Sequence, residues 1–173
     1  MIPSDHFVRF YNEVFKFLDK QGDGALEKYY LEIGRHQELH CLELFKIKGL
    51  HGMYDYWERI RIEENCDMTL DLQPDCLILT MDKCPSLTKA MDNDAGLCLK
   101  YCDHCPGWVG HVLTSAGYWM VYDLIDREKP QCREYIFKKR KAAELKLQEL
   151  QQTGHDLVFT NFSPQNFFTT NSH

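Results

Sequence analysis

The stretch DMTLDLQPDCLILTMD, residues 67–82, decides how this chain folds. In its first half, Met68, Leu70 and Leu72 alternate with aspartate or threonine, and alternation with a period of two is typical of a half-buried strand. Pro74 and Asp75 then favour a turn. The apolar run that follows is short enough to be the second strand of a hairpin. A sheet is therefore expected to begin near the middle of the chain.

Upstream of this hairpin, apolar residues recur at helical spacing in three segments. Each segment has one apolar face, which has to pack against another part of the molecule. Ser4 and Asp5 offer an N-cap for the first segment, and the QGDG sequence separates it from the second. The expected helices span residues 5–19, 25–48 and 53–62.

Downstream of the hairpin, the pattern predicts two helices, two further strands and a last helix. One helix starts in CPSLTKAMDND and the other after CDHC, while the strands are YWMVYDLID, residues 118–126, and CREYIF, residues 132–137. Residues 138–152 have strong helix propensity but few large apolar side chains. We therefore expect the last helix to be exposed or to dock on a partner.

This order of elements predicts an α+β fold. N-terminal helices come first, and a four-stranded antiparallel sheet in the order ββααββ follows, with helices on one face and a C-terminal helix. The length of 173 residues favours a single domain, which we expect to span residues 1–153. Its expected parts and the remaining tail are a helical part (1–65), a cysteine-rich sheet part (66–138), a terminal helix (139–153) and a C-terminal tail (154–173).

Charge and hydropathy limit the partners of the chain. The net charge of −6 gives no electrostatic reason to expect nucleic acid as a partner. No stretch approaches the roughly 18 to 20 consecutive apolar residues of a membrane span, so no membrane partner is expected. The first fifteen residues lack the basic and then apolar pattern of an export signal, which favours a cytoplasmic location.

Eight cysteines are the most informative feature of the composition. In a reducing compartment they are expected to be core residues, metal ligands or reactive thiols rather than disulfides. The stretch LKYCDHCPGWVG, residues 99–110, contains the CxxC pair of Cys102 and Cys105. A zinc ion held by this pair would need further ligands, because structural zinc takes four. The candidate metal ligands are Cys84, Cys98, Cys102, Cys105 and Cys132, with His104 or His111 as alternatives.

A second interpretation of the same residues is thiol chemistry. A cysteine near a helix N-terminus loses its proton more easily, because the helix dipole stabilises the thiolate. Pro106 and Gly107 indicate a helix start just after Cys105, and Pro85 does the same after Cys84. The simpler alternative is that these cysteines are buried small hydrophobes, as most free cysteines are.

The layout of these residues resembles a known family. A hairpin strand runs into CPS at residues 84–86. It is followed by Cys98, Cys102 and Cys105, then by a short helix, a strand and a last strand that begins with Cys132. Over residues 67–138 this layout is similar to the bacterial L-2-amino-thiazoline-4-carboxylic acid hydrolase-like family. It resembles more loosely the 4-vinyl-reductase small-molecule-binding domains. The resemblance implies an α+β domain with a small organic ligand beside the cysteines and hydrolysis of a cyclic amidine-like bond.

The leading hypothesis is a hydrolase-like enzyme that binds a small molecule. In its thiol version, Cys84 or Cys102 attacks the substrate, and His104 or His111 accepts the proton. In its metal version, the cysteines hold zinc, and a bound water is the nucleophile. Asp103 or Asp82 would be the base in that version.

Two other hypotheses remain open. One is a noncatalytic zinc or ligand sensor whose C-terminal helix and tail bind a partner, including a second copy of the chain. The phenylalanines that favour it are Phe159, Phe162, Phe167 and Phe168. The other is a cysteine-rich core with the function elsewhere, for instance at His36 and His40, which lie on one face of a helix.

Overall fold

The computed structural model describes residues 5–22, 24–92 and 94–163. Its N-terminal part consists of the helices α1 (Asp5–Gln21), α2 (Ala25–Lys48) and α3 (Leu50–Glu63), which confirms the three expected helices. Gly49 joins α2 to α3 with a positive φ of 59°, a conformation that favours glycine. A Cβ atom there would also lie 2.6 Å from the Tyr118 hydroxyl, which would have to move to make room for it.

The sheet has five antiparallel strands in the order β1-β2-β4-β3-β5. The strands are β1 (Asp67–Leu72), β2 (Cys76–Lys83), β3 (Trp119–Asp123), β4 (Cys132–Phe137) and β5 (Val158–Thr160). Between β2 and β3 the chain forms α4 (Pro85–Met91), a 3₁₀ turn η1 (Tyr101–Asp103) and α5 (His104–Ala116). Helix α6 (Arg140–Gln152) lies between β4 and β5. The α+β class and the ββααββ order are therefore confirmed.

The fifth strand corrects the expected number of four. Strand β5 lies in the segment expected to be a tail and pairs with β3, whose outer edge would otherwise be open. Asn161 extends this pairing, because its Oδ1 accepts a hydrogen bond of 2.8 Å from the Met120 nitrogen. Phe159 packs against the main core, and Phe162 packs on Trp119. Phe167 and Phe168 lie outside the described residues.

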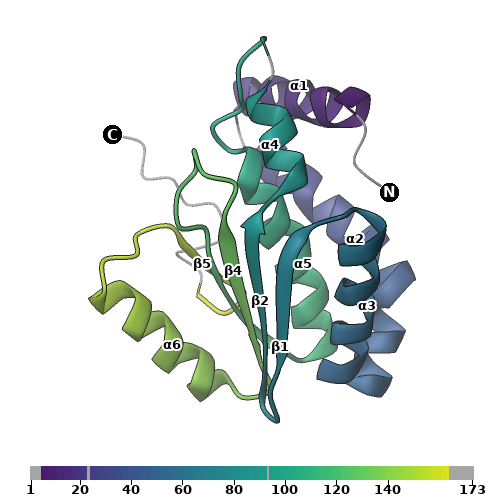
Figure 1. Ribbon diagram of the computed structural model, residues 1–173, viewed down its shortest axis with the longest axis vertical. Coiled ribbons are helices and arrows are strands. Elements are labelled where there is room, and N and C mark those ends of the chain that lie inside the picture. The colour runs from purple at the N-terminus through teal and green to yellow at the C-terminus, as the bar shows by residue number, and fades with distance from the viewer. Residues whose placement is uncertain (1–4, 23, 93, 164–173) are drawn as a thin grey trace.

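The helices cover both faces of the sheet, not one. Figure 1 shows α6 on one side of the strands and α5 and α3 on the other. The alternation of β4 explains this arrangement, because Tyr135 and Phe137 point to the α6 side, where Ala143 and Leu150 bury them. The C-terminal helix is thus a cover for this chain's own sheet.

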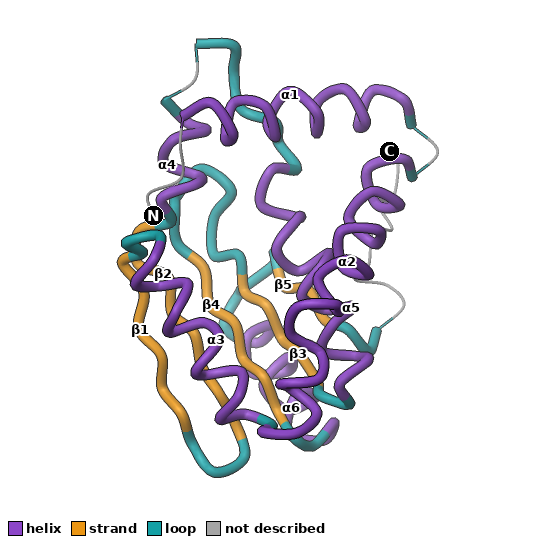
Figure 2. The backbone as a smooth tube through the Cα atoms, turned by 90° about the vertical axis from the view of Figure 1, so that its right-hand side faces the viewer, coloured by secondary structure: helices purple, strands orange, loops and turns teal. Residues whose placement is uncertain are grey.

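The opposite face of the sheet carries the main core and positions the site. Ile136 of β4 and Met120 of β3 are fully buried there, under α2, α3 and α5. Figure 2 shows these helices in front of the strands, with α1 and α4 at one end. Among the described residues, no helix combines the length and the apolar character that a membrane crossing requires.

Candidate functional site

A cavity of about 460 Å³ lies between the sheet and the N-terminal helices. Its wall is formed by α1, α2, α3, the start of α4, α5 and one face of the strands. Most of the lining is apolar, which is the usual character of a site for a small organic molecule. The aromatic side chains of the wall include Tyr11, Phe15, Phe45, Tyr56, Trp57 and Trp108.

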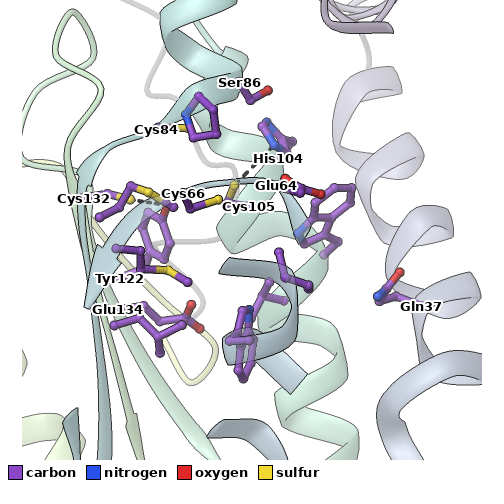
Figure 3. Close-up of a pocket in the computed structure, with 18 of the residues that line it drawn as sticks. Gln37, Glu64, Cys66, Cys84, Ser86, His104, Cys105, Tyr122, Cys132 and Glu134 are labelled. Carbon is purple, nitrogen blue, oxygen red and sulfur yellow. Dashed lines mark hydrogen bonds between the residues drawn. The ribbon is translucent and has the colours of Figure 1, made fainter. Parts of the chain in front are cut away.

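Five cysteines from separate parts of the chain line this cavity. They are Cys41 of α2, Cys66 before β1, Cys84 before α4, Cys105 of α5 and Cys132 of β4. Figure 3 shows Cys66, Cys105 and Cys132 at one level of the cavity, with Cys84 nearer the start of α4. The fold thus brings Cys84, Cys105 and Cys132, which the motif analysis selected, to one wall.

The other cysteines considered from the sequence lie outside the cavity wall. Cys98 is buried beside Leu87 and Tyr101 at the α1 end of the molecule. Cys102 packs between this cluster and the main core, and burial raises the pKa of its thiol far above the usual value. Cys76 is buried on the other face of the sheet, under α6. Cys102 is therefore not placed to attack a molecule in the cavity.

Cys84 has the expected position at a helix start but not the expected acidity. Its Sγ accepts a hydrogen bond of 3.4 Å from the Leu87 nitrogen as the N-cap of α4. Such a contact favours the thiolate, yet burial raises the pKa of Cys84 to about 11. The loss of hydration outweighs the helix terminus, so the thiol stays protonated at neutral pH.

Cys105 and His104 form a thiol–imidazole pair at the start of α5. His104 Nε2 lies 3.2 Å from Cys105 Sγ, and both residues line the cavity. Nδ1 of His104 hydrogen-bonds to the Tyr101 carbonyl oxygen. Because a carbonyl only accepts, Nδ1 carries the proton, and Nε2 is left with the lone pair that faces the thiol. Burial lowers the pKa of His104, which keeps this ring neutral.

The hydroxyl of Tyr122 forms hydrogen bonds with cysteines of the cavity. It donates a hydrogen bond of 3.0 Å to Cys132 Sγ from the neighbouring strand β3. A hydrogen bond with Tyr122 also lowers the pKa of the Cys105 thiol, but burial outweighs it and raises this pKa to about 12. Sequence reasoning missed Tyr122, because its place beside the sulfurs depends on the pairing of β3 with β4.

Two carboxyl groups face the cavity, and sequence reasoning selected neither. Glu134 of β4 is only 6% exposed, and its Oε1 has no hydrogen-bond partner in the described structure. Burial alone raises the pKa of Glu134 to about 8. Glu64, at the end of α3, is less buried, and loss of hydration raises its pKa as well. The alternation of β4 could have indicated Glu134, because it stands between Cys132 and Ile136 on the face of the strand that points to the core.

The remaining acidic and histidine candidates either have another partner or lie on the surface. Asp103 is buried in an ion pair with Arg127, and Asp82 is exposed. His111 lies 3.2 Å from Glu38, where α5 packs on α2. His36 and His40 are exposed on α2. His104 is therefore the histidine that the structure places at the thiol.

Zinc binding receives no support from the arrangement of possible ligands. Within the residues that the structure describes, no three histidine, cysteine, aspartate or glutamate side chains are grouped so that they could hold a metal ion. All eight cysteines are free thiols. The zinc site over Cys84, Cys98, Cys102, Cys105 and Cys132 stays a prediction from the sequence.

Comparisons with known proteins found no relative of this chain. No protein-family model matches the chain, and no curated protein and no solved structure matches it. The resemblance to the amino-thiazoline hydrolase-like family therefore stays a prediction, and the function has to be argued from the cavity itself.

Proposed function

We propose that this protein binds a small organic molecule in the cavity and cleaves a carbon–nitrogen bond of that molecule with the thiol of Cys105. The substrate class is a small cyclic amidine, as the family resemblance implies. The observation that carries the proposal is the pair of His104 Nε2 and Cys105 Sγ, 3.2 Å apart on the cavity wall. A base within hydrogen-bond distance of a nucleophile is the arrangement that covalent catalysis requires.

The surroundings of the pair support the role of His104 as the base. Its ring is enclosed by Phe15, Tyr101 and Trp108, with centroids 5.6, 5.2 and 5.1 Å away. These contacts and the Tyr101 carbonyl fix the ring orientation and the tautomer. A lowered pKa leaves Nε2 free to accept a proton at neutral pH. The raised pKa of Cys105 means that the thiolate forms during attack and not before it.

The chemical step balances with water as the co-reactant. Cys105 Sγ adds to the amidine carbon, and the thiol proton moves to His104 Nε2. The carbon–nitrogen bond to the leaving nitrogen breaks, and that nitrogen takes the proton from His104. Water then adds to the carbon of the resulting thioimidate, the carbon–sulfur bond breaks, and the products are an amide and the free thiol.

A second candidate function is ligand binding without catalysis. The raised pKa values of Cys84, about 11, and Cys105, about 12, favour it, because a protonated thiol is a weak nucleophile. In this case the cysteines serve as polarizable cavity walls.

The test is turnover of 2-amino-2-thiazoline, a small cyclic amidine, followed by liquid chromatography and mass spectrometry. We expect the unaltered protein to consume the compound. Cys105→Ala should abolish turnover while binding, measured by calorimetry, persists. His104→Asn should slow turnover by roughly 10²-fold, which is typical for loss of a general base. Cys76→Ala is the matched control, because Cys76 is a buried cysteine on the opposite face of the sheet.

Two results would overturn the catalytic proposal. The first is binding without turnover by the unaltered protein, which would establish the noncatalytic function. The second is turnover by folded Cys105→Ala at the rate of Cys76→Ala, which would show that Cys105 is not the nucleophile.

A further inference from the structure

Glu134 is a buried polar group of the cavity wall that the proposed reaction does not use. It stands in β4, in the middle of the sheet, and its neighbours across the strands are Leu79 of β2 and Tyr122 of β3. The apolar Leu79 offers no hydrogen bond, and the Tyr122 hydroxyl donates to Cys132 instead. Oε1 is left without a partner. A buried acceptor without a hydrogen bond destabilises the folded protein, so its presence in the wall of a cavity indicates a partner outside the chain.

The carboxyl group faces the cavity and not the packed core. Glu134 belongs to the cavity wall, and Figure 3 shows its oxygen atoms directed toward the interior. Glu64 adds a second carboxyl group to the same wall. Among the described lining residues there is no lysine and no arginine. The described wall thus offers carboxyl groups and no permanently cationic side chain.

Aromatic rings complete a surface that suits positive charge. Phe45 and Trp57 stack with centroids 5.3 Å apart, and Tyr56 meets Phe45 edge to face at 5.5 Å. Ring faces attract cations through their quadrupole, most strongly where water is excluded. An anionic group of a ligand would meet neither a cationic side chain nor a favourable field in this wall.

We infer that the natural ligand is an organic cation without a carboxylate, and that Glu134 holds its positively charged nitrogen. This inference rests on the proposed binding function of the cavity but not on the hydrolytic step. It departs from the amino-thiazoline carboxylic acid named in the resembled family, because the described wall has no lysine or arginine that would form an ion pair with that carboxylate.

The experiment uses three probes of nearly the same shape, which are benzamidine, benzamide and benzoate. Their affinities for the full chain are measured by calorimetry at pH 8.5, where Glu134 is largely ionised and benzamidine is still a cation. We expect benzamidine to bind at least about tenfold more tightly than benzamide, since a charge-assisted hydrogen bond is involved, and benzoate to bind most weakly. Glu134→Gln should abolish the preference for benzamidine, and Glu64→Gln should leave most of it.

The possible results separate this inference from the binding function. Equal binding of benzamidine and benzamide, or tighter binding of benzoate, would overturn the cation inference while the cavity remains a binding site. Loss of the preference in Glu64→Gln but not in Glu134→Gln would overturn the role of Glu134. Binding of none of the three probes would overturn the inference together with the proposed binding function. The comparison of probes in the unaltered protein decides the ligand charge even where a variant fails to fold.

Discussion

Asn12 of α1 and Cys98, 86 positions later in the chain, are joined by a hydrogen bond of 2.8 Å from the Cys98 nitrogen to Asn12 Oδ1. The same side chain donates through Nδ2 to the Gly96 carbonyl at 2.8 Å. Asn12 is fully buried, and the Cys98 nitrogen depends on it, while the Gly96 carbonyl also accepts a hydrogen bond of 3.3 Å from Lys16 Nζ. One amide thus ties α1, which forms part of the cavity wall, to the segment that leads into η1 and α5.

Asn12→Ala should lower the free energy of unfolding by roughly 2 kcal/mol, because it leaves the Cys98 nitrogen without its partner and removes one of the two hydrogen bonds to the Gly96 carbonyl. Urea unfolding measures the change, and Lys20→Ala on the exposed side of α1 is the control. An effect no larger than that of the control would mean that the tie contributes little.

Glu134 should make the ligand-free protein less stable as the pH rises. Its pKa is raised from 4.5 to about 8, so the folded state binds more protons than the unfolded state between these values. Stability is then lost progressively from about pH 4.5 to 8, by up to a few kcal/mol. Glu134→Gln should flatten this part of the profile, as measured by urea unfolding at each pH.

The comparison of the two proteins isolates Glu134 from its neighbours. Glu64, whose pKa is also raised, contributes with the same sign in both proteins. The thiols of Cys105 and Cys132 and the Tyr122 hydroxyl titrate above this window. Parallel profiles for the two proteins would contradict the raised pKa.

Cys84 and Cys105 should react slowly with iodoacetamide at pH 7, because burial raises the pKa of these thiols to about 11 and about 12. The rate should increase roughly tenfold for each pH unit while the protein stays folded. Peptide mass spectrometry after timed alkylation follows each cysteine, with glutathione as the reference thiol. Alkylation faster than glutathione at pH 7 would show that the helix termini outweigh burial after all.

Chelation should leave the melting temperature unchanged, since the described residues offer no group of three ligands for a metal ion. The measurement is a thermal melt with and without EDTA, together with elemental analysis of the purified protein. One zinc ion per chain, with a melting temperature lowered by EDTA, would support the zinc prediction made from the sequence and would indicate a rearrangement of the cysteines.

Replacing Ile125 with glycine should stabilise the fold. Its φ is 63°, a region that a β-branched residue enters at a cost, and its backbone nitrogen is held there by Asp123 Oδ1 at 3.2 Å. Ile125→Gly should raise the free energy of unfolding by up to about 1 kcal/mol. Ile125→Ala keeps a Cβ in the same conformation, so it should be the less stable of the two variants in urea. The opposite order would show that the apolar contacts of Ile125 outweigh the strain.

Local periodicity was sufficient for most of the fold. The alternation of Met68, Leu70 and Leu72 and the helical spacing upstream depend on neighbouring residues alone, so they were predictable. Strand β5 was not, because its three residues have no readable period, and their extended form depends on the free edge of β3. The position of α6 was not predictable either, because helix propensity predicts a helix but not the face of the sheet that the helix covers.

The candidate site was predictable where a short motif contained it. Cys84, His104 and Cys105 lie within two such motifs, and all three line the cavity. Cys102 belongs to one of these motifs too, but its side chain lies outside the wall. Glu134 was missed because nothing next to it in the sequence says that Leu79 and Tyr122 will be its neighbours.

The sequence by itself determined the class of fold, the order of its elements and the concentration of sulfur, because these follow from residue types and their spacing. The tertiary structure alone decided which thiols share a cavity, which carboxyl group is left without a partner, and whether the thiols are acidic. The physical reason is that pairing partners and hydration are set by residues distant in the chain. The sequence and the structure both place Cys84 at the N-terminus of a helix. Only its burial, which the structure shows, raises the pKa of the thiol.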